Sequence, residues 1–563
     1  MNEEQTPYTV MLEPKLQSRT LDNWTPKDSL VAALIGLATV AVFVWTFNWS
    51  SGAALFLSIF TLLVLWSLLT RRKVGWGRGY EEIGQAYRTH VLKKRKGVWW
   101  QASDNEVGAS KPRLFAPPPV IPLKLNIIPA VTAGRVHRIP VLSHLDKPYD
   151  QLIIRVKGGV FGALDGRELY EAHEELTRVC NIALSSTKLQ AGIAFQYVSA
   201  PIHEHDFVDE MRRKGSPIWR FPEQFDLDDQ QREFADMQAE YASQLIPTFQ
   251  AAGATENWSL IVITIKRTSK SRAAEQGKLD HNALYNLPVL KLGRELVEML
   301  STSPRLGFSD AHILKPHELF LLIRLSWDVV GIQDFYTTYY DLVDRYEGLK
   351  KKLVQEFEQL TEDPETDTDD LETRLADLDR QMLNELTEIT SCWPSSIISE
   401  DDEVIRMNDN YISVLRVDET PEFVVDSEYL SQLEEIPFGH WIRRFIGGES
   451  ISGSKETYAI MGKQATTAQV EGLLSEKLIV SHPKMRRLQE RLANQADLVS
   501  NHSIAQLFGE YWAVVADSSE ACTEQRGKLS SRLSARGFMT RVVDVPALHV
   551  DAVLTATLGT FRM

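Results

Sequence analysis

The residues that come closest to a catalytic pattern lie near position 450, where the sequence GESISGSKE runs from Gly448 to Glu456. A nucleotide-binding P-loop requires Gly-x-x-x-x-Gly-Lys-Ser/Thr, because its backbone amides cradle the phosphates and its lysine reaches the terminal ones. Gly448 and Gly453 have the required separation, but Ser454 precedes Lys455 and no serine or threonine follows that lysine. We therefore predict that this chain does not hydrolyse nucleotides.

Two histidines in the segment Ile202–Asp206 are the next candidates. His203 and His205 would project from one face of an extended segment, and two imidazoles could begin a metal site. The sequence offers no third ligand near them, and the segment directly follows Pro201. A solvated loop is the favoured interpretation, so we predict neither a metal nor a cofactor.

Other patterns that carry chemistry are missing from the sequence. It contains no Gly-x-Ser-x-Gly, no His-Glu-x-x-His and no paired Gly-x-Gly-x-x-Gly. The three cysteines, Cys180, Cys392 and Cys522, are far apart and form no Cys-x-x-Cys, which is typical of free thiols in a reducing compartment. We expect a protein that is not an enzyme.

Two apolar segments near the N-terminus organise the rest of the chain. Leu30–Trp49 and Gly52–Leu69 carry no charge and are separated only by Ser50 and Ser51. Each is close to the roughly 20 residues that a helix needs to cross a bilayer. The pattern predicts a transmembrane hairpin over residues 30–70, preceded by a cytosolic segment over residues 1–29.

A basic stretch over residues 71–100 follows the predicted hairpin. Residues 71–97 hold nine basic and two acidic side chains, and such a flank stays on the cytoplasmic side of a membrane. We therefore expect a two-pass plasma-membrane protein with both termini cytoplasmic. The candidates for contact with the anionic lipids of the inner leaflet are Arg71, Arg72, Lys73, Arg78, Lys93, Lys94, Arg95 and Lys96. Residues 75–97 have the pattern of an amphipathic helix that lies near the membrane, and the alternative is that this helix is an ordinary cytosolic extension of the second span.

The remainder of the chain is acidic. The net charge is −15, of which residues 71–97 contribute +7 and residues 1–29 contribute −2, leaving −20 for residues 98–563. Binding to DNA requires a basic surface that neutralises the phosphates, so direct nucleic-acid binding by this body is not expected.

The body divides into three parts behind a Pro-rich linker over residues 101–122. Residues 123–330 alternate apparent strands with helices of about 15 residues, and residues 391–563 repeat that alternation. The predicted fold is a two-span membrane helical hairpin joined to a cytosolic α+β, α/β-layered body. The similar order of elements in the two regions also suggests a duplication.

Between the two regions, residues 331–390 have a helical pattern of their own. Apolar residues recur every three or four positions on both sides of the acidic segment that contains Pro364, which predicts an antiparallel helical hairpin. As an arm it could bind a partner through Leu342, Leu349, Leu353, Leu375, Leu378 and Met382. The alternative is that this apolar stripe simply packs on the body.

The order of these parts resembles a family of membrane proteins from actinobacterial conjugation-type loci. Those proteins are similar to the small hairpin subunit of type IV secretion systems fused to the non-motor N-terminal half of the large secretion ATPase. The resemblance rests on RRKVGWGRGYEEIGQAYRTH, on Lys278–Asp328 with its Arg-Glu-Leu step at Arg294–Leu296, and on the closing TATLGTFRM. The chain departs from the family at Val329, where a proline is common, and in its longer arm.

The resemblance implies a membrane-anchored, non-enzymatic scaffold of a type IV-like conjugative or secretion machine. Its partners would be a separate hexameric ATPase, other secretion subunits and further copies of this chain, and it supplies no catalytic residues. The alternative function is a membrane-tethered sensor or regulator whose body binds a small ligand.

Overall fold

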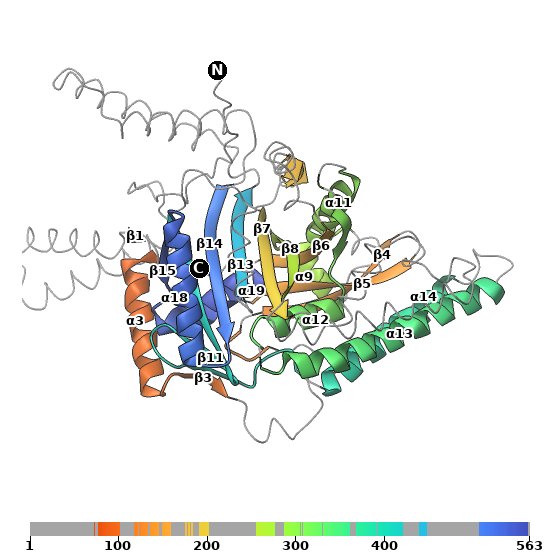
Figure 1. The fold of residues 1–563 in the computed structure, drawn as a ribbon. Helices are drawn as coiled ribbons and strands as arrows, with labels where there is room; N and C mark the ends of the chain where they lie inside the picture. Colours follow the sequence, from red (N-terminus) through yellow and green to blue (C-terminus); the bar gives the residue numbers. More distant parts are fainter. Residues whose placement is uncertain are drawn as a thin grey trace, which may run out of the picture.

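The computed structural model describes residues 72–101, 117–158, 175–183, 191–201, 255–275, 286–360, 368–419, 439–447 and 506–560, with short breaks inside several of these ranges. Its dominant feature is one sheet of 13 strands in which every pairing is antiparallel (Figure 1). Eleven strands follow the order β3-β10-β11-β12-β14-β13-β7-β8-β6-β5-β4, while β15 pairs with β12 and β9 pairs with β6.

The strands of this sheet are β3 (Val98–Gln101), β4 (Leu123–Thr132), β5 (Arg135–His144), β6 (Tyr149–Gly158), β7 (Ala191–Pro201), β8 (Thr255–Lys266), β9 (Phe308–Ile313), β10 (Ser396–Ser399), β11 (Ile405–Met407), β12 (Asn410–Glu419), β13 (Gly439–Gly447), β14 (Gln506–Ala516) and β15 (Met539–Val542). A separate two-stranded sheet joins β1 (Arg72–Lys73) to β2 (Gly77–Arg78). The helices are α3 (Gly79–Lys94), α9 (Ser269–Glu275), α11 (Pro288–Thr302), α12 (Pro316–Leu325), α13 (Ile332–Leu360), α14 (Thr368–Ile389), α18 (Ser519–Ala535), the 3-10 turn η4 (Pro546–Leu548) and α19 (His549–Leu558).

This architecture corrects the predicted fold class. The body is not two α/β-layered regions, because the strands of both regions join one antiparallel sheet. Among the described residues, no helix is both long enough and apolar enough to cross a membrane. The two longest described helices, α13 and α14, are rich in charged residues. The predicted two-span fold and the two-pass plasma-membrane localisation are contradicted by this finding, and the apolar segments 30–49 and 52–69 lie outside the described residues.

The first half of the sheet forms a recognisable unit. Its strands lie in the order β7-β8-β6-β9, with α11 between β8 and β9 and α12 directly after β9. If the four strands are numbered along the chain, the order across the sheet is 2-3-1-4, which is that of a ferredoxin-like sheet. The hairpin strands β4 and β5 precede this unit and pair with each other and with the start of β6.

The second half of the sheet has the same arrangement. Its strands lie in the order β13-β14-β12-β15, with α18 between β14 and β15 and α19 after β15. The short strands β10 and β11 precede β12 and pair as β4 and β5 do before β6. The described chain therefore contains two structural repeats, and the α13–α14 arm lies between them.

The registers of the two repeats agree at the middle of their strands. In the first repeat, Ile154 of β6 opposes Ile261 of β8 and is also the first residue of β6 that pairs with β9. In the second repeat, Leu415 of β12 opposes Trp512 of β14 and is the first residue of β12 that pairs with β15. Phe195 of β7 opposes Ile261, just as Trp441 of β13 opposes Trp512.

The repeats join through an antiparallel ladder between β7 and β13 that contains nine residue pairs. Gln196 and Ile442 are equivalent positions of the two repeats and pair with each other, and the pairs on either side exchange equivalent positions, Phe195 with Arg443 and Tyr197 with Trp441. The two repeats are therefore related by a local twofold relation at the middle of the sheet.

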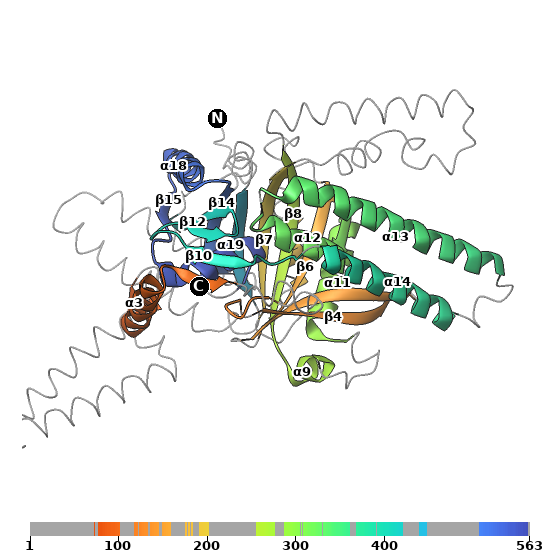
Figure 2. The same ribbon diagram turned by 90° about the horizontal axis from the view of Figure 1, so that it is seen from below.

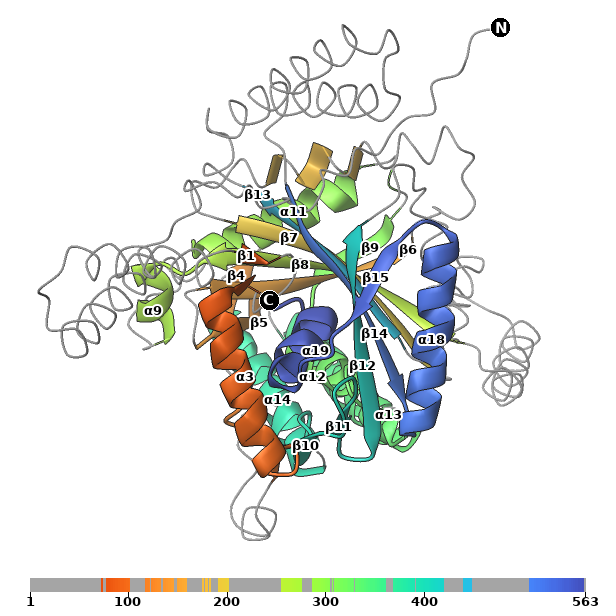
Figure 3. The same cartoon turned by 90° about the vertical axis from the view of Figure 1, so that its left-hand side faces the viewer.

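The sheet has an apolar layer on each face because its strands alternate their side chains. Along β8, Ile261, Ile263 and Ile265 pack with α11, whereas Leu260 and Val262 face the core that contains α12, α13, α14 and α19. In the second repeat, Trp512 and Val514 pack with α18. Figure 3 shows α12 and α19 close together near the middle of the sheet, with α18 set apart from them.

The end of each repeat's last helix is held by the other repeat. Gln151 of β6 donates from Nε2 to the Gly559 carbonyl at 2.6 Å, and Gln196 of β7 donates to the Thr557 carbonyl, both at the end of α19. In the opposite direction, His440 of β13 donates from Nε2 to the Leu325 carbonyl of α12 at 3.2 Å. These contacts are buried, so each repeat contributes polar partners to the other.

Glycine is required where α19 ends. Gly559 has a φ of +67°, and a Cβ at this position would lie 3.1 Å from Ile442 Cδ1 and 3.2 Å from Val262 Cγ1. A left-handed conformation with so little space suits glycine alone. This close approach lets the Gly559 carbonyl reach Gln151.

We predict that Gln196→Ala lowers the free energy of unfolding by about 1–3 kcal/mol, because it leaves the buried Thr557 carbonyl without its donor. The effect is measured by chemical denaturation, with tryptophan fluorescence as the readout of unfolding. Lys266→Ala, at the exposed end of β8, is the matched control and should change stability by less than about 0.5 kcal/mol. Equal stability of the two variants would contradict this role for Gln196.

Candidate functional site

The α13–α14 arm is the most distinctive surface element of the described structure. Figures 1 and 2 show the two helices lying side by side and extending away from the sheet. Both helices predicted over residues 331–390 are present, and the ion pair between Lys350 and Asp379, at 2.6 Å, joins them.

The six predicted interface residues, five leucines and one methionine, do not form one exposed surface. Leu342 and Met382 are buried in the core and Leu378 packs against it, so these three hold the base of the arm on the body. Leu349 is 43% exposed, while Leu353 and Leu375 are half-buried. The structure therefore divides the stripe into a base that packs on the body and a more distal part that stays accessible.

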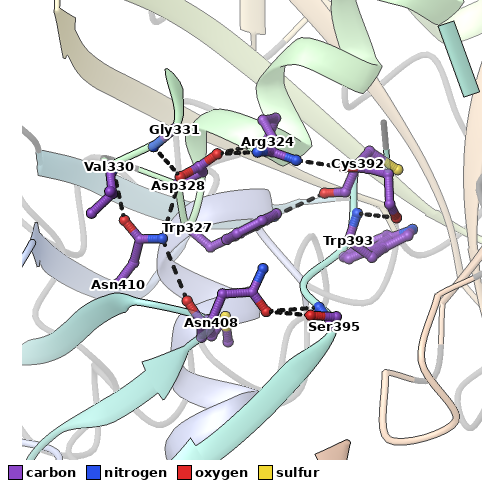
Figure 4. A network of polar contacts seen from close by, with 12 residues as sticks. Arg324, Trp327, Asp328, Val330, Gly331, Cys392, Trp393, Ser395, Asn408 and Asn410 are labelled. Atoms are coloured by element: carbon purple, nitrogen blue, oxygen red, sulfur yellow. Dashed lines mark hydrogen bonds and ion pairs between the residues drawn. The ribbon is translucent and has the colours of Figure 1, made fainter. Parts of the chain in front are cut away.

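An ion pair anchors the arm at the corner between α12 and α13 (Figure 4). Arg324 contacts the Asp328 carboxylate through both Nε and Nη2, and the Asp328 side chain is only 3% exposed. The second oxygen of Asp328 accepts hydrogen bonds from the Gly331 amide at 2.9 Å and from Asn410 Nδ2 at 3.3 Å. The Asn410 side chain also accepts from the Val330 amide at 3.0 Å, which links the corner to the second repeat.

The segment that leads from the end of α14 back to β10 is held at the same corner. Arg324 Nη1 donates to the Ser391 carbonyl at 2.8 Å, and Trp327 Nε1 donates to the Cys392 carbonyl at 2.8 Å. The side-chain oxygen of Asn408 then accepts from the amides of Ser395 and Ser396 at the start of β10. Both ends of the arm are thus fixed by hydrogen bonds, and the one from Trp327 to Cys392 is buried.

A second set of charges runs along the arm. Lys315, before α12, lies 3.6 Å from Glu347 of α13, which is also 3.0 Å from Lys350. Nearer the base of the arm, Glu385 of α14 pairs with Arg345 and accepts a hydrogen bond from the Tyr346 hydroxyl at 2.8 Å. These pairs fix the two helices relative to each other and to α12.

The predicted basic surface residues lie at the opposite end of the molecule. Lys93, Lys94, Arg95 and Lys96 are exposed at the end of α3, and Lys93 forms an ion pair with Asp402 at 3.0 Å. Arg72, Lys73 and Arg78 belong to β1 and β2, whereas Arg71 lies outside the described residues. Gly97, with a φ of +77°, turns the chain into β3, and a Cβ there would collide with the Ser399 carbonyl.

The strongest group of ionisable side chains is centred on His312 of β9. Its Nδ1 lies 2.8 Å from Asp310 and its Nε2 lies 3.1 Å from Glu318, while Arg155 lies 3.7 Å from Glu318 and covers the Trp258 ring at 3.6 Å. Burial favours neutral imidazole, but the two carboxylates outweigh it and raise the pKa of His312 to about 9. Burial raises the pKa of Glu318, yet its bonds with His312 bring it well below its usual value.

This geometry does not suit acid–base catalysis. Both nitrogens of His312 already contact carboxylates, so the ring is held as an imidazolium with no free nitrogen to accept a proton. Sequence reasoning missed this group because Asp310 and His312 are two residues apart on a strand and Glu318 belongs to the next helix. The only signal in the sequence was that Asp310 and His312, two positions apart, would lie on the same face of a strand.

Within the described residues, no group of three or more histidine, cysteine, aspartate or glutamate side chains is arranged so that it could hold a metal ion. His203, His205 and the segment Gly448–Glu456 lie outside that part of the chain. Cys180, Cys392 and Cys522 are buried free thiols, and burial raises the pKa of each, that of Cys180 to about 12. Unreactive thiols of this kind contribute to packing.

Comparison of the chain with models of known protein families and with curated proteins finds no match.

We predict that Asp328→Ala lowers the free energy of unfolding by about 3 kcal/mol, since it leaves Arg324 without the carboxylate that balances its charge. Urea unfolding measures the loss, and Asp334→Ala, an exposed position in the first turn of α13, is the control. Equal stabilities would show that the ion pair does not anchor the arm.

The His312 group predicts a pH dependence of stability. Because the folded-state pKa is about 9 and the ordinary value is 6.5, the group stabilises the fold fully below pH 6.5. Its contribution declines as the pH rises from 6.5 to 9. Melting temperatures of the wild type and of His312→Gln over this range should converge as the pH increases. Parallel curves for the two proteins would contradict the assignment.

Proposed function

We propose that this chain is a non-enzymatic scaffold subunit of a type IV-like conjugative or secretion machine, and that it docks a separate hexameric ATPase. The resemblance of its order of parts to the conjugation-type family supports the secretion context. The described structure supports the scaffold role through one observation, the continuous sheet that unites two repeats and holds a two-helix arm in a fixed position.

A scaffold must keep its binding surfaces in a constant relative geometry. Nine residue pairs between β7 and β13 join the repeats, and side chains from each repeat hold the helix ends of the other. The arm is held at both ends by contacts with α12 and with the β11–β12 hairpin. Force or binding at one end of this body is therefore transmitted through packed elements.

The chemistry of the described residues favours binding over catalysis. The main ionisable group, around His312, is saturated by its own neighbours, and the buried thiols are protonated. The acidic charge of the body is suited to basic protein partners and opposes contact with nucleic-acid phosphates.

Capture of the ATPase tests this function. The flanking genes should encode a P-loop ATPase, and the tagged full-length chain should retain that neighbouring ATPase but not a P-loop ATPase from an unrelated machine. The purified chain alone should release no phosphate from ATP. Failure to capture the neighbouring ATPase, or ATP hydrolysis by the chain itself, would contradict the proposal.

A further inference from the structure

The two repeats differ at one edge of the sheet. In the second repeat, β3 pairs with β10 and covers the outer edge of the hairpin that precedes β12. In the first repeat, β4 is the equivalent of β10, and among the described residues β5 is the only strand that pairs with it. The strand position that β3 fills in one repeat therefore has no counterpart among the described residues of the other repeat.

Positions on β4 and β10 can be matched, because β5 and β11 join the two repeats in the same register. Leu125 of β4 opposes Leu142 of β5. Ser399 of β10 opposes Ile405 of β11, and Ile405 is equivalent to Leu142, so Leu125 corresponds to Ser399. The Ser399 amide donates to the Gly97 carbonyl at 2.9 Å, where the chain enters β3. The equivalence therefore directs the Leu125 amide to the outer edge of β4, the edge that faces away from β5.

A proline in β5 fixes the direction of these amides independently. Pro140 opposes Ile127 and has no N–H, so this pair cannot exchange two ladder hydrogen bonds. Bonded and non-bonded pairs alternate along an antiparallel ladder, so Leu125 and Ile127 both direct their N–H and C=O groups away from β5. Pro129, the next outward position, has no N–H to donate. The outer edge of β4 thus presents two consecutive sets of ladder groups, at Leu125 and Ile127.

The side chains at this edge offer the same kind of surface that β3 covers in the second repeat. Leu125 and Ile127 are half-buried and pack against the core that contains α12, α14 and α19. Trp99 and Trp100 of β3 are half-buried against that same core. A strand added to β4 would therefore find backbone partners together with apolar surface for large side chains.

The number of strands indicates where the added strand comes from. Each chain has two equivalent edges, β4 and β10, but its described elements include one β3. The ladder holds β3 on β10, and Trp99 Nε1 also donates to Ser399 Oγ at 2.9 Å. Because further copies of the chain use their own β3 in the same way, the occupant of β4 is a segment of a different protein.

We propose that the outer edge of β4 binds an extended segment of a different protein by β-strand addition. The segment has the chemistry of β3, with aromatic side chains that pack over Leu125 and Ile127. In this mode of recognition the main-chain hydrogen bonds provide affinity and the side chains provide selectivity. The inference goes beyond the proposed function, because it depends neither on an ATPase nor on a secretion context.

Binding of a peptide to the full-length protein tests this site. The probe is a fluorescein-labelled peptide with the sequence Arg95–Asp104, which contains β3, and fluorescence anisotropy measures its binding. Ile127→Pro removes an outward N–H where an edge strand tolerates proline, and should weaken binding at least about tenfold. The matched control Ile127→Ala keeps that N–H and should lose less affinity. Lys124→Ala, an exposed position whose N–H points toward β5, should bind as wild type does.

Two measurements on the wild-type protein keep the test decisive even if Ile127→Pro disturbs the hairpin. N-methyl groups on Val98, Trp99 and Trp100 of the peptide preserve its side chains but remove ladder donors, and should weaken binding at least about tenfold. Residue-resolved hydrogen–deuterium exchange should show that the peptide protects the Leu125 and Ile127 amides.

Three results would overturn the proposal: no binding at about 1 mM peptide, equal binding of the N-methylated peptide, or protection of β10 in place of β4. Self-association of the chain that the peptide disrupts would identify a second copy as the occupant and would also overturn it. The assay contains no ATPase, so its failure is distinct from a failure of the proposed function.

Discussion

The antiparallel ladder between β7 and β13 is the interaction on which the rest of the structure depends. It places the second strand of one repeat beside the second strand of the other, in a register that pairs Gln196 with Ile442. Because side chains alternate strictly along a strand, a shift of one residue would turn the buried face of β13 outward. The register therefore determines which residues of one repeat can reach the helices of the other.

The crossed hydrogen bonds are the main consequence of this register. Gln151 and Gln196 reach the end of α19, and His440 reaches the end of α12, only because the ladder brings these positions together. Burial lowers the pKa of His440 to about 4, which keeps its ring neutral and allows Nε2 to donate while Nδ1 remains unprotonated. The α12 end then sets the corner at Asp328 from which the arm departs. A continuous path of contacts thus connects the centre of the sheet to the arm.

Local patterns in the sequence were sufficient to predict some of these elements. The three- and four-residue spacing of leucines around Pro364 predicts α13 and α14. The order of elements suggested a duplication, and the strand pairings give both halves the same order. The antiparallel sheet was not predictable in the same way, because alternating strands and helices are compatible with either parallel or split β-α-β arrangements. The roles of Gln196 and Asp328 depend on partners 361 and 82 residues away, which no local pattern specifies.

A rigid two-repeat body is the central claim of this account, since a scaffold requires it. Hydrogen–deuterium exchange of the amides in β7 and β13 tests it most directly. The account predicts that both strands exchange only through global unfolding, with the same opening free energy and the same dependence on denaturant. Exchange of β13 and the rest of its repeat at a lower opening free energy than β7 would show that the repeats open independently, and would contradict the account.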